Sequence, residues 1–481
     1  MLERLAVDSV DCLAVEDSTA GLAAAVGAGI PTVVAPSVHT RGDDFPGALA
    51  VLDDLATAAL DELQDLHSAQ RRPLGGGRSL QVTLRAVTSS PVRARWAISA
   101  QFFTNGVIGG SFLPRLPEIK QAYELSDTAY GFVVVALPLG SILAAAVAGP
   151  LIRRFGALQV AVIGTVAYAV LLALAGFSPS VLLFVPIMLT AGVMDAVLDS
   201  GQNVHGMAVE RWYDKSIINS LHASWSLGAT MGGFIGAASA GAGIPIGWQM
   251  AVGAVVWSAL AVIAGINGAV PEKFVRSATS EAEIPDQPVA NSGRRFPWAR
   301  FVPLAVLAIC GTLVEDVANN WVTLYLFREI GAAIGVAGAG FAIMLGAQFV
   351  GRMLGDPMTD RWGRGAVART GGAMISVGGL IAVIAPNTWV AVAGFAIAGF
   401  GTATLVPAAY AASDGLPGVP HGTGIAMLGW FMRIGFLVTS PAIGLMADAV
   451  GLHLALLILP AAGIVATVLA HGTVRNSNNS R

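Results

Sequence analysis

One long apolar segment carries three polar side chains at helical spacing. Asp195, Asp199 and Asn203 recur every four residues, so in a helix they share one face. An ionisable side chain inside a membrane-spanning segment is energetically costly and therefore marks a candidate functional site. A carboxyl group removed from water there could take up a proton near neutral pH. We expect this face to line a polar cavity; the alternative is that it only bonds a neighbouring helix or lines the inner mouth of the bundle.

A second apolar segment carries a polar face of the same kind, formed by Asn219, His222 and Ser226. Histidine is the side chain whose charge changes closest to neutral pH. His222 is therefore a candidate proton carrier. The alternative is that its ring serves only as a hydrogen-bonded spacer between helices.

The segment GTLVEDVANNW combines two adjacent acids with amides and an aromatic ring. One helical face holds Thr312, Glu315, Asn319 and Thr323, and Asp316 and Asn320 lie beside it. Two adjacent acids cannot both point into one narrow cavity, so one of Glu315 and Asp316 faces it. Asn320 and Trp321 suit a polyhydroxylated or aromatic solute, through hydrogen bonds and a stacking face. The alternative places Trp321 in an aromatic belt at the membrane surface.

Arg433 is a permanently charged side chain near the centre of another apolar segment. A guanidinium there needs an acidic partner or a water-filled cavity. We expect Glu315 as its partner, with Asp199 as the second candidate. Protonation of the acid would weaken such a pair and link proton uptake to helix movement, whereas a static pair would only fix the packing. Arg352, near the cytoplasmic end of its segment, is expected either to extend its charge to the membrane surface or to pair with Asp356 one turn on.

The composition indicates which elements must hold these side chains. The chain has 481 residues, of which 55% are hydrophobic and 12% charged, whereas soluble domains carry about 25% charged residues. A helix needs about 20 apolar residues to cross the hydrocarbon core. Twelve such runs occur, at 96–114, 129–150, 158–177, 181–203, 217–240, 246–269, 300–326, 334–355, 367–385, 389–411, 422–446 and 453–472. The sequence therefore predicts an all-α membrane protein with twelve transmembrane helices.

The placement of Lys and Arg predicts the orientation of the chain. If the N-terminus is inside, nearly all basic residues fall in cytoplasmic segments, and only Arg115, Lys120 and Arg328 fall outside. We therefore expect a multi-pass protein of the cytoplasmic (inner) membrane with both termini in the cytoplasm. The formal net charge of −3 gives no indication of a nucleic-acid partner. Cys12 and Cys310 provide no disulfide or metal framework, and we expect no cofactor.

An internal repeat divides the apolar part into two halves of six helices. GPLIRRFG (149–156) and DPMTDRWG (356–363) lie 207 residues apart, each after the second run of its half. Parallel six-helix repeats imply a central cavity between the halves. The expected organisation is an N-terminal segment 1–62, a basic linker 63–95, an N-half 96–270, a central cytoplasmic loop 271–299, a C-half 300–473 and a cytoplasmic tail 474–481.

These features together resemble a major facilitator superfamily transporter over residues 95–472. The signature of that superfamily between helices 2 and 3 is Gly-x-x-x-Asp-Arg-x-Gly, and in the family this loop is a charged latch that holds one conformation. The matching positions are Gly149, Arg153, Arg154 and Gly156 in the N-half and Asp356, Asp360, Arg361 and Gly363 in the C-half. Because Arg153 replaces the acid, the resemblance leaves Asp360 and Arg361 to provide the latch.

Four stretches resemble a bacterial branch of the superfamily that is distantly similar to fucose–proton symporters. They are LPRLPEIK (113–120), LDSGQNVHGMAVERWY (198–213), LHASWSLG (221–228) and RIGFLVTSPAIG (433–444). Proton antiporters of the superfamily often have an arginine in helix 4 and Gly-Pro in helix 5. Both features are missing here, which favours symport or transport without proton coupling. Similar members have an acid followed by a tryptophan in helix 7, which favours Glu315 with Trp321.

The stretch VEDSTAGLAAAVGAGI near the N-terminus resembles the fourth motif of haloacid dehalogenase-type hydrolases. In that family the acidic pair holds Mg²⁺, and Glu16 and Asp17 match it. The family's nucleophilic Asp-x-Asp loop, Ser/Thr and Lys precede this motif, and only eleven residues precede Cys12 here. We therefore expect an incomplete α/β fragment without activity, derived from a gene fusion or from a start site inside a longer frame.

Three functions are compatible with the sequence. The leading interpretation is a secondary active transporter, not an enzyme, that moves a small polar or amphipathic solute by alternating access. It would work as a monomer in the lipid bilayer, and solute transport in it is either coupled to proton movement or independent of it. The alternatives are a haloacid dehalogenase-type phosphatase–transporter fusion and a non-transporting membrane sensor or scaffold. The solute, the direction of transport and the coupling ion stay open.

Overall fold

The computed structural model describes residues 12–37, 40, 44–52, 90–144, 147–272, 274–275, 296–416, 419 and 422–473. The chain forms two compact units, Met1–Arg85 and Ala86–Arg481. Most of the predicted linker, most of the predicted central loop and the whole predicted tail lie outside the described residues.

The first unit contains a small parallel sheet and one helix. The sheet has the order β1 (Ala14–Glu16), β2 (Thr32–Val34) and β3 (Ala50–Val51). Helix α2 (Thr19–Gly27) connects β1 to β2, and the side chain of Ser18 caps it by accepting a hydrogen bond from the Gly21 amide at 3.2 Å. Leu22 and Val33 are buried between the helix and the sheet. The unit therefore has the α/β character that the sequence predicts for this fragment.

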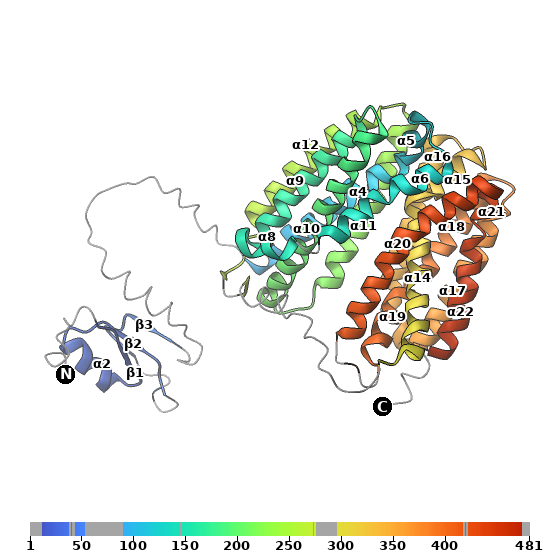
Figure 1. The fold of residues 1–481 in the computed structure, drawn as a ribbon. Coiled ribbons are helices and arrows are strands. Elements are labelled where there is room, and N and C mark those ends of the chain that lie inside the picture. The colour runs from blue at the N-terminus through green and yellow to red at the C-terminus, as the bar shows by residue number, and fades with distance from the viewer. Residues whose placement is uncertain are drawn as a thin grey trace. The chain divides into compact units, whose positions relative to one another are not determined.

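The second unit is helical throughout its described part (Figure 1). The N-half contains α4 (Pro91–Phe112), η3 (Leu113–Arg115), α5 (Leu116–Ala122), α6 (Asp127–Val134), α7 (Ala136–Leu143), α8 (Ala148–Phe155), α9 (Ala157–Gly176), α10 (Val181–Tyr213), α11 (Ile218–Gly241) and α12 (Ile246–Asn267). The C-half contains α14 (Trp298–Asn320), α15 (Val322–Arg328), α16 (Ile334–Trp362), α17 (Arg364–Val383), α18 (Thr388–Thr402), α19 (Leu405–Asp414), α20 (Thr423–Val450), α21 (Leu452–Ala455) and α22 (Ile458–Thr473).

The described helices account for the predicted membrane spans. Nine spans are long and apolar enough to cross a membrane, and a pair of segments bent by 54°, α6–α7 with α8, makes a tenth. Helices α4 and α11 have 22 and 24 residues, the length of a span, but they carry polar side chains that face other helices. With these two helices, the fold has the twelve spans in two halves that the sequence predicts.

The repeat is visible in the backbone of the two motif loops. Gly156 joins α8 to α9 with φ 85° and ψ 148°, and Gly363 joins α16 to α17 with φ 80° and ψ 149°. Glycine adopts a positive φ without the steric cost that other residues meet. The same turn at the same place in each half explains why both motifs end on glycine.

Helices α4 and α11 approach each other closely enough to require glycine. A Cβ atom at Gly106 would lie 2.1 Å from the carbonyl oxygen of Trp225, and one at Gly228 would lie 2.2 Å from that of Phe103. Small residues allow such backbone contact in membranes, where packing rather than water drives helix association.

We expect Gly106→Ala to destabilise the helical unit by about 1–3 kcal/mol, because the added methyl group must push two backbones apart. Thermal unfolding of the protein in detergent measures the effect. Gly253→Ala on α12 is the matched control, since its Cβ would meet Trp257 only at 3.5 Å. Equal melting temperatures for the two variants would contradict the tight α4–α11 contact.

The two halves meet through α11 against α16 and through α6 against α20. Figure 1 shows the halves approaching each other at the end that holds α5, α6, α15 and α21, and diverging toward the end that holds α8 and α19. We call the first the closed end, marked by Asp127 and Arg328, and the second the open end, marked by His222 and Asp360.

Candidate functional site

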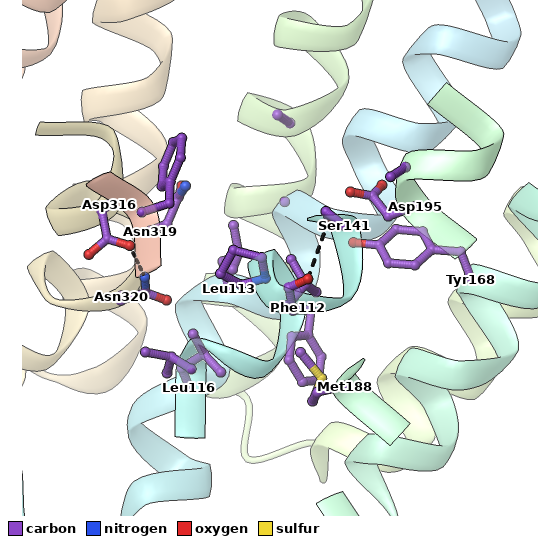
Figure 2. A pocket seen from close by; sticks show the side chains of 18 of the residues that line it. Phe112, Leu113, Leu116, Ser141, Tyr168, Met188, Asp195, Asp316, Asn319 and Asn320 are labelled. Atoms are coloured by element: carbon purple, nitrogen blue, oxygen red, sulfur yellow. Dashed lines mark hydrogen bonds between the residues drawn. The ribbon is translucent and has the colours of Figure 1, made fainter. Parts of the chain in front are cut away.

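A cavity of about 400 Å³ lies between the halves, and both halves line it. Figure 2 shows Ser141, Tyr168 and Asp195 on one side and Asp316, Asn319 and Asn320 on the other. Apolar side chains, including Phe112 and Met188, cover much of the remaining wall, and Arg433 completes the C-half side. The cavity predicted from the repeat is therefore present, and it is mainly apolar with a few polar groups. This is the usual make-up of a small-molecule site.

A hydrogen-bonded network holds the C-half wall in place. Asp316 is 2% exposed and accepts hydrogen bonds from the Asn320 amide at 3.0 Å and from the Ser440 hydroxyl. The Ser440 hydroxyl in turn accepts from the Trp321 indole N–H at 3.0 Å and from Asn320 at 3.2 Å. The network joins α14 to α20, so the carboxylate position depends on both helices.

The acid of the N-half wall, Asp195, is not held by a hydrogen-bonded network of this kind. Asp195 on α10 lies beside Tyr168 of α9 (Figure 2). The Ser141 hydroxyl on α7 donates to the backbone carbonyls of Gly192 at 3.1 Å and Leu137 at 3.3 Å, not to the acid. Within the described ranges, Asp195 has no hydrogen bond or ion pair to another residue. Its carboxylate is therefore available to a solute or a proton.

The expected pair between Arg433 and Glu315 is wrong. Glu315 instead accepts hydrogen bonds from Arg352 at 2.7 Å and from Gln348 at 2.6 Å, both on α16. Successive helical residues point about 100° apart, so Asp316 faces the central cavity while Glu315 faces α16. Because Glu315 faces α16, Arg352 pairs with Glu315 instead of with Asp356.

Arg433 lines the central cavity, as its position in the membrane suggested, but without an acidic partner. Its guanidinium lies over the Trp430 ring, 5.2 Å from the ring centre. Among the residues that the structure describes, no carboxylate lies within 4.0 Å of it. Its side chain is exposed rather than packed in protein, so the guanidinium is accessible from the cavity.

Trp321 has neither of the roles considered for it. Its side chain is fully buried, with its ring edge-on to Tyr130 at 5.2 Å. It is part of neither the cavity lining nor a membrane-facing belt. The ring packs between α14, α6 and α20 and orients Ser440.

The remaining sequence candidates on α10 and α11 lie outside the central cavity. Asp199 is exposed, and its backbone carbonyl accepts a hydrogen bond from Asn203 at 2.9 Å. His222 packs its ring edge-on to Phe102 at 5.3 Å and lines a second cavity of about 910 Å³ toward the open end. Of the predicted three-residue face on α10, only Asp195 reaches the central cavity.

The motif residues lie at the open end. Arg154 lies over the Phe155 ring at 5.2 Å, and Arg361 lies over the Trp362 ring at 5.8 Å, so the repeat extends to side-chain packing. Gly149 and Arg153 lie in α8, while Asp356 and Asp360 line the second cavity. In the described part of the chain, Asp356, Asp360 and Arg361 make no ion pair within 4.0 Å.

Side chains from both halves close the opposite end. Arg328 of α15 donates two hydrogen bonds to the Asp127 carboxylate of α6, at 2.7 and 2.8 Å. Lys120 approaches the same carboxylate at 3.2 Å. Asp448 of α20 accepts from the amides of Asp127 at 3.0 Å and Thr128 at 2.8 Å, and so neutralises the N-terminus of α6.

The backbones also meet directly at this end. The Tyr130 hydroxyl donates to the Asn320 carbonyl across the halves at 2.6 Å. A Cβ atom at Gly131 would lie 2.5 Å from the Ser440 carbonyl oxygen, and one at Gly444 would lie 2.4 Å from that of Asp127. We call these contacts, with those of Arg328, Lys120 and Asp448, the closed-end network. Sequence reasoning found only the unusual outer position of Lys120 and Arg328.

Comparisons with known proteins identify the family. The model of the Major Facilitator Superfamily matches residues 98–312 and 304–479, and the chain therefore belongs to that superfamily of membrane transporters. The chain is 27% identical over 378 residues to an uncharacterized transporter, y4wD, of Sinorhizobium fredii, covering 78% of this chain and 96% of that protein. It also matches the crystal structure of a D-xylose–proton symporter, with a TM-score of 0.63, 15% identity and coverage of 81% of this chain and 99% of that one.

The N-terminal unit has different relatives. It is similar to a haloacid dehalogenase-like hydrolase domain-containing protein of Arabidopsis thaliana, with 42% identity over 64 residues, or 13% of this chain and 20% of that protein. This confirms the resemblance of the fragment. The carboxylate of Glu16 lies against α2, where a Cβ at Gly21 would be 2.0 Å from it. The described residues contain no group of three or more His, Cys, Asp or Glu that could hold a metal ion.

Proposed function

We propose that this transporter is a secondary active transporter that moves a small polar or amphipathic solute by alternating access. The observation that supports it most is the asymmetry of the bundle. The central cavity is separated from one end by the closed-end network, whereas the second, larger cavity lies toward the other end. Alternating access requires a central site that faces one side of the membrane at a time.

The distribution of Lys and Arg supports an orientation with both termini in the cytoplasm. In that orientation the open end faces the cytoplasm, which favours an inward-open state of a monomer in the cytoplasmic membrane. Asp356, Asp360 and Arg361 then lie at the cytoplasmic mouth, free to pair when that mouth closes.

Both halves contribute polar side chains to the cavity, which supports a role for the solute in bringing the halves together. A solute that bonds to Asn319 and Asp316 of the C-half and to Asp195 of the N-half favours a state in which the halves approach each other. Asp195 has no protein partner in the described residues, and its protonation is the simplest way to couple proton movement to transport.

A transport assay tests this function. A metabolite library is first screened for solutes that raise the unfolding temperature of the purified protein. Flux of those solutes is then measured in proteoliposomes with and without a pH gradient. We expect uptake that responds to the gradient and a loss of that response in Asp195→Asn. A protein that binds solutes and moves none would contradict the proposal.

A further inference from the structure

Two opposite charges face the central cavity from opposite halves. Asp195 on α10 and Arg433 on α20 both line it. Neither side chain forms an ion pair within 4.0 Å or a hydrogen bond to any residue in the described part of the chain. The third charged lining residue, Asp316, differs because Asn320 and Ser440 both donate to it.

Among the described residues, neither charge has a replacement partner. Glu315, the acid expected from the sequence to pair with Arg433, is already paired with Arg352 at 2.7 Å. Asp199 lies one turn from Asp195 and carries the same charge. Arg433 is exposed and Asp195 is half-buried, so both charges are accessible from the cavity. Ionisable side chains without a protein partner at membrane depth mark a ligand site, and a ligand that pairs with both explains why the two face one cavity.

We propose that the transported solute is a zwitterion, an amino carboxylate whose ammonium group binds Asp195 and whose carboxylate binds Arg433. This rests on the proposed transport function and names the chemical class of its solute. Arginine binds carboxylates through two parallel hydrogen bonds. The solute neutralises both charges at once and joins the N-half to the C-half, so its binding favours closure of the halves.

The remaining wall indicates the body of the solute. Phe112, Leu116, Phe184, Met188 and Trp225 line the same cavity. These rings and aliphatic chains favour an apolar or aromatic body between or beside the two charged groups. A volume of about 400 Å³ admits a solute of the size of phenylalanine or 6-aminohexanoate.

Binding to the full-length protein in nanodiscs tests the class. The probes are phenylalanine with its analogues phenethylamine and 3-phenylpropanoate, and 6-aminohexanoate with hexylamine and hexanoate. We expect at least one zwitterion to bind, and each analogue that lacks one charge to bind at least about tenfold more weakly. In Asp195→Asn, a zwitterion should bind no more tightly than its analogue without the ammonium group. In Arg433→Gln, it should bind no more tightly than its analogue without the carboxylate. Arg433→Lys should retain part of the preference for a carboxylate.

Asp214→Asn, at the exposed end of α10, is the matched control for Asp195→Asn, and Arg300→Gln at the exposed start of α14 is the control for Arg433→Gln. Failure of both zwitterions to bind, or equal binding of a zwitterion and its two analogues, would overturn the inference. If the protein nevertheless transports a solute of another class, the proposed transport function stands and only the zwitterion inference fails. If the protein transports no solute at all, the proposed function itself fails.

Discussion

Replacing Asp127 by asparagine is expected to open the closed end of the bundle. The carboxylate, 6% exposed, accepts two hydrogen bonds from Arg328 of the other half and lies 3.2 Å from Lys120. Hydrogen bonds to a charged group contribute about 1.5–3 kcal/mol. Loss of that amount shifts the ratio of two conformations by about tenfold to a hundredfold.

The shift can be measured as the rate at which a maleimide modifies a cysteine placed at Ile119 of α5, which is buried at this end and lies outside the closed-end network. Cys310 and Cys12 are replaced first. Glu329→Gln is the matched control, because Glu329 also pairs with Arg328, at 2.9 Å, but within the C-half. We expect faster modification in Asp127→Asn and an unchanged rate in Glu329→Gln. Equal rates in all three proteins would show that the Asp127–Arg328 pair does not hold the halves together.

Replacing Asp316 by asparagine is expected to lower solute affinity and flux by about tenfold to a hundredfold, since one charged acceptor is lost from a buried network. Asp316→Ala should be more severe, because the Ser440 and Asn320 donors then have no acid to bond. The measurements are solute binding in nanodiscs and flux in proteoliposomes.

Glu315→Gln gives the sharpest comparison with Asp316→Asn. The two acids are adjacent in the chain, but Glu315 bonds Arg352 and Gln348 of α16 instead of lining the central cavity. We expect the solute affinity of Glu315→Gln to stay within about threefold of that of the unchanged protein. Loss of one charged hydrogen bond to the solute would lower the affinity by more than that. A larger loss in Glu315→Gln than in Asp316→Asn would return Glu315 to the solute site.

The architecture could be predicted from sequence because its signals are local. Apolar runs of span length, the placement of Lys and Arg, and the motif pair ending at Gly156 and Gly363 each depend on residues close together in the chain. The fold agrees with these signals, including the identical turns at both glycines.

The site was only partly predictable, because helical spacing gives the face of a residue but not the direction in which that face points. Asp195 and Arg433 reach the cavity as expected, whereas Asp199 and Trp321 do not. The choice between Glu315 and Asp316 depends on the rotation of α14 against α16 and α20, which packing sets. The family resemblance favoured the acid that turned out to bond α16.

The closed-end network was beyond sequence reasoning for a different reason. Asp127, Arg328 and Asp448 come from three distant parts of the chain, and their contacts depend on the register of one half against the other. Each residue alone resembles an ordinary charged side chain at the end of a helix.

Distances between spin labels across the two ends test alternating access most directly. One pair, at Gln121 and Ala333, spans the closed end, and another, at Ser216 and Gly415, spans the open end; all four positions are exposed. As a transported solute is added, the account predicts that the first distance lengthens in part of the population while the second shortens. Two distances that stay single and unchanged with saturating solute, in a protein that still transports it, would contradict alternating access between these two halves.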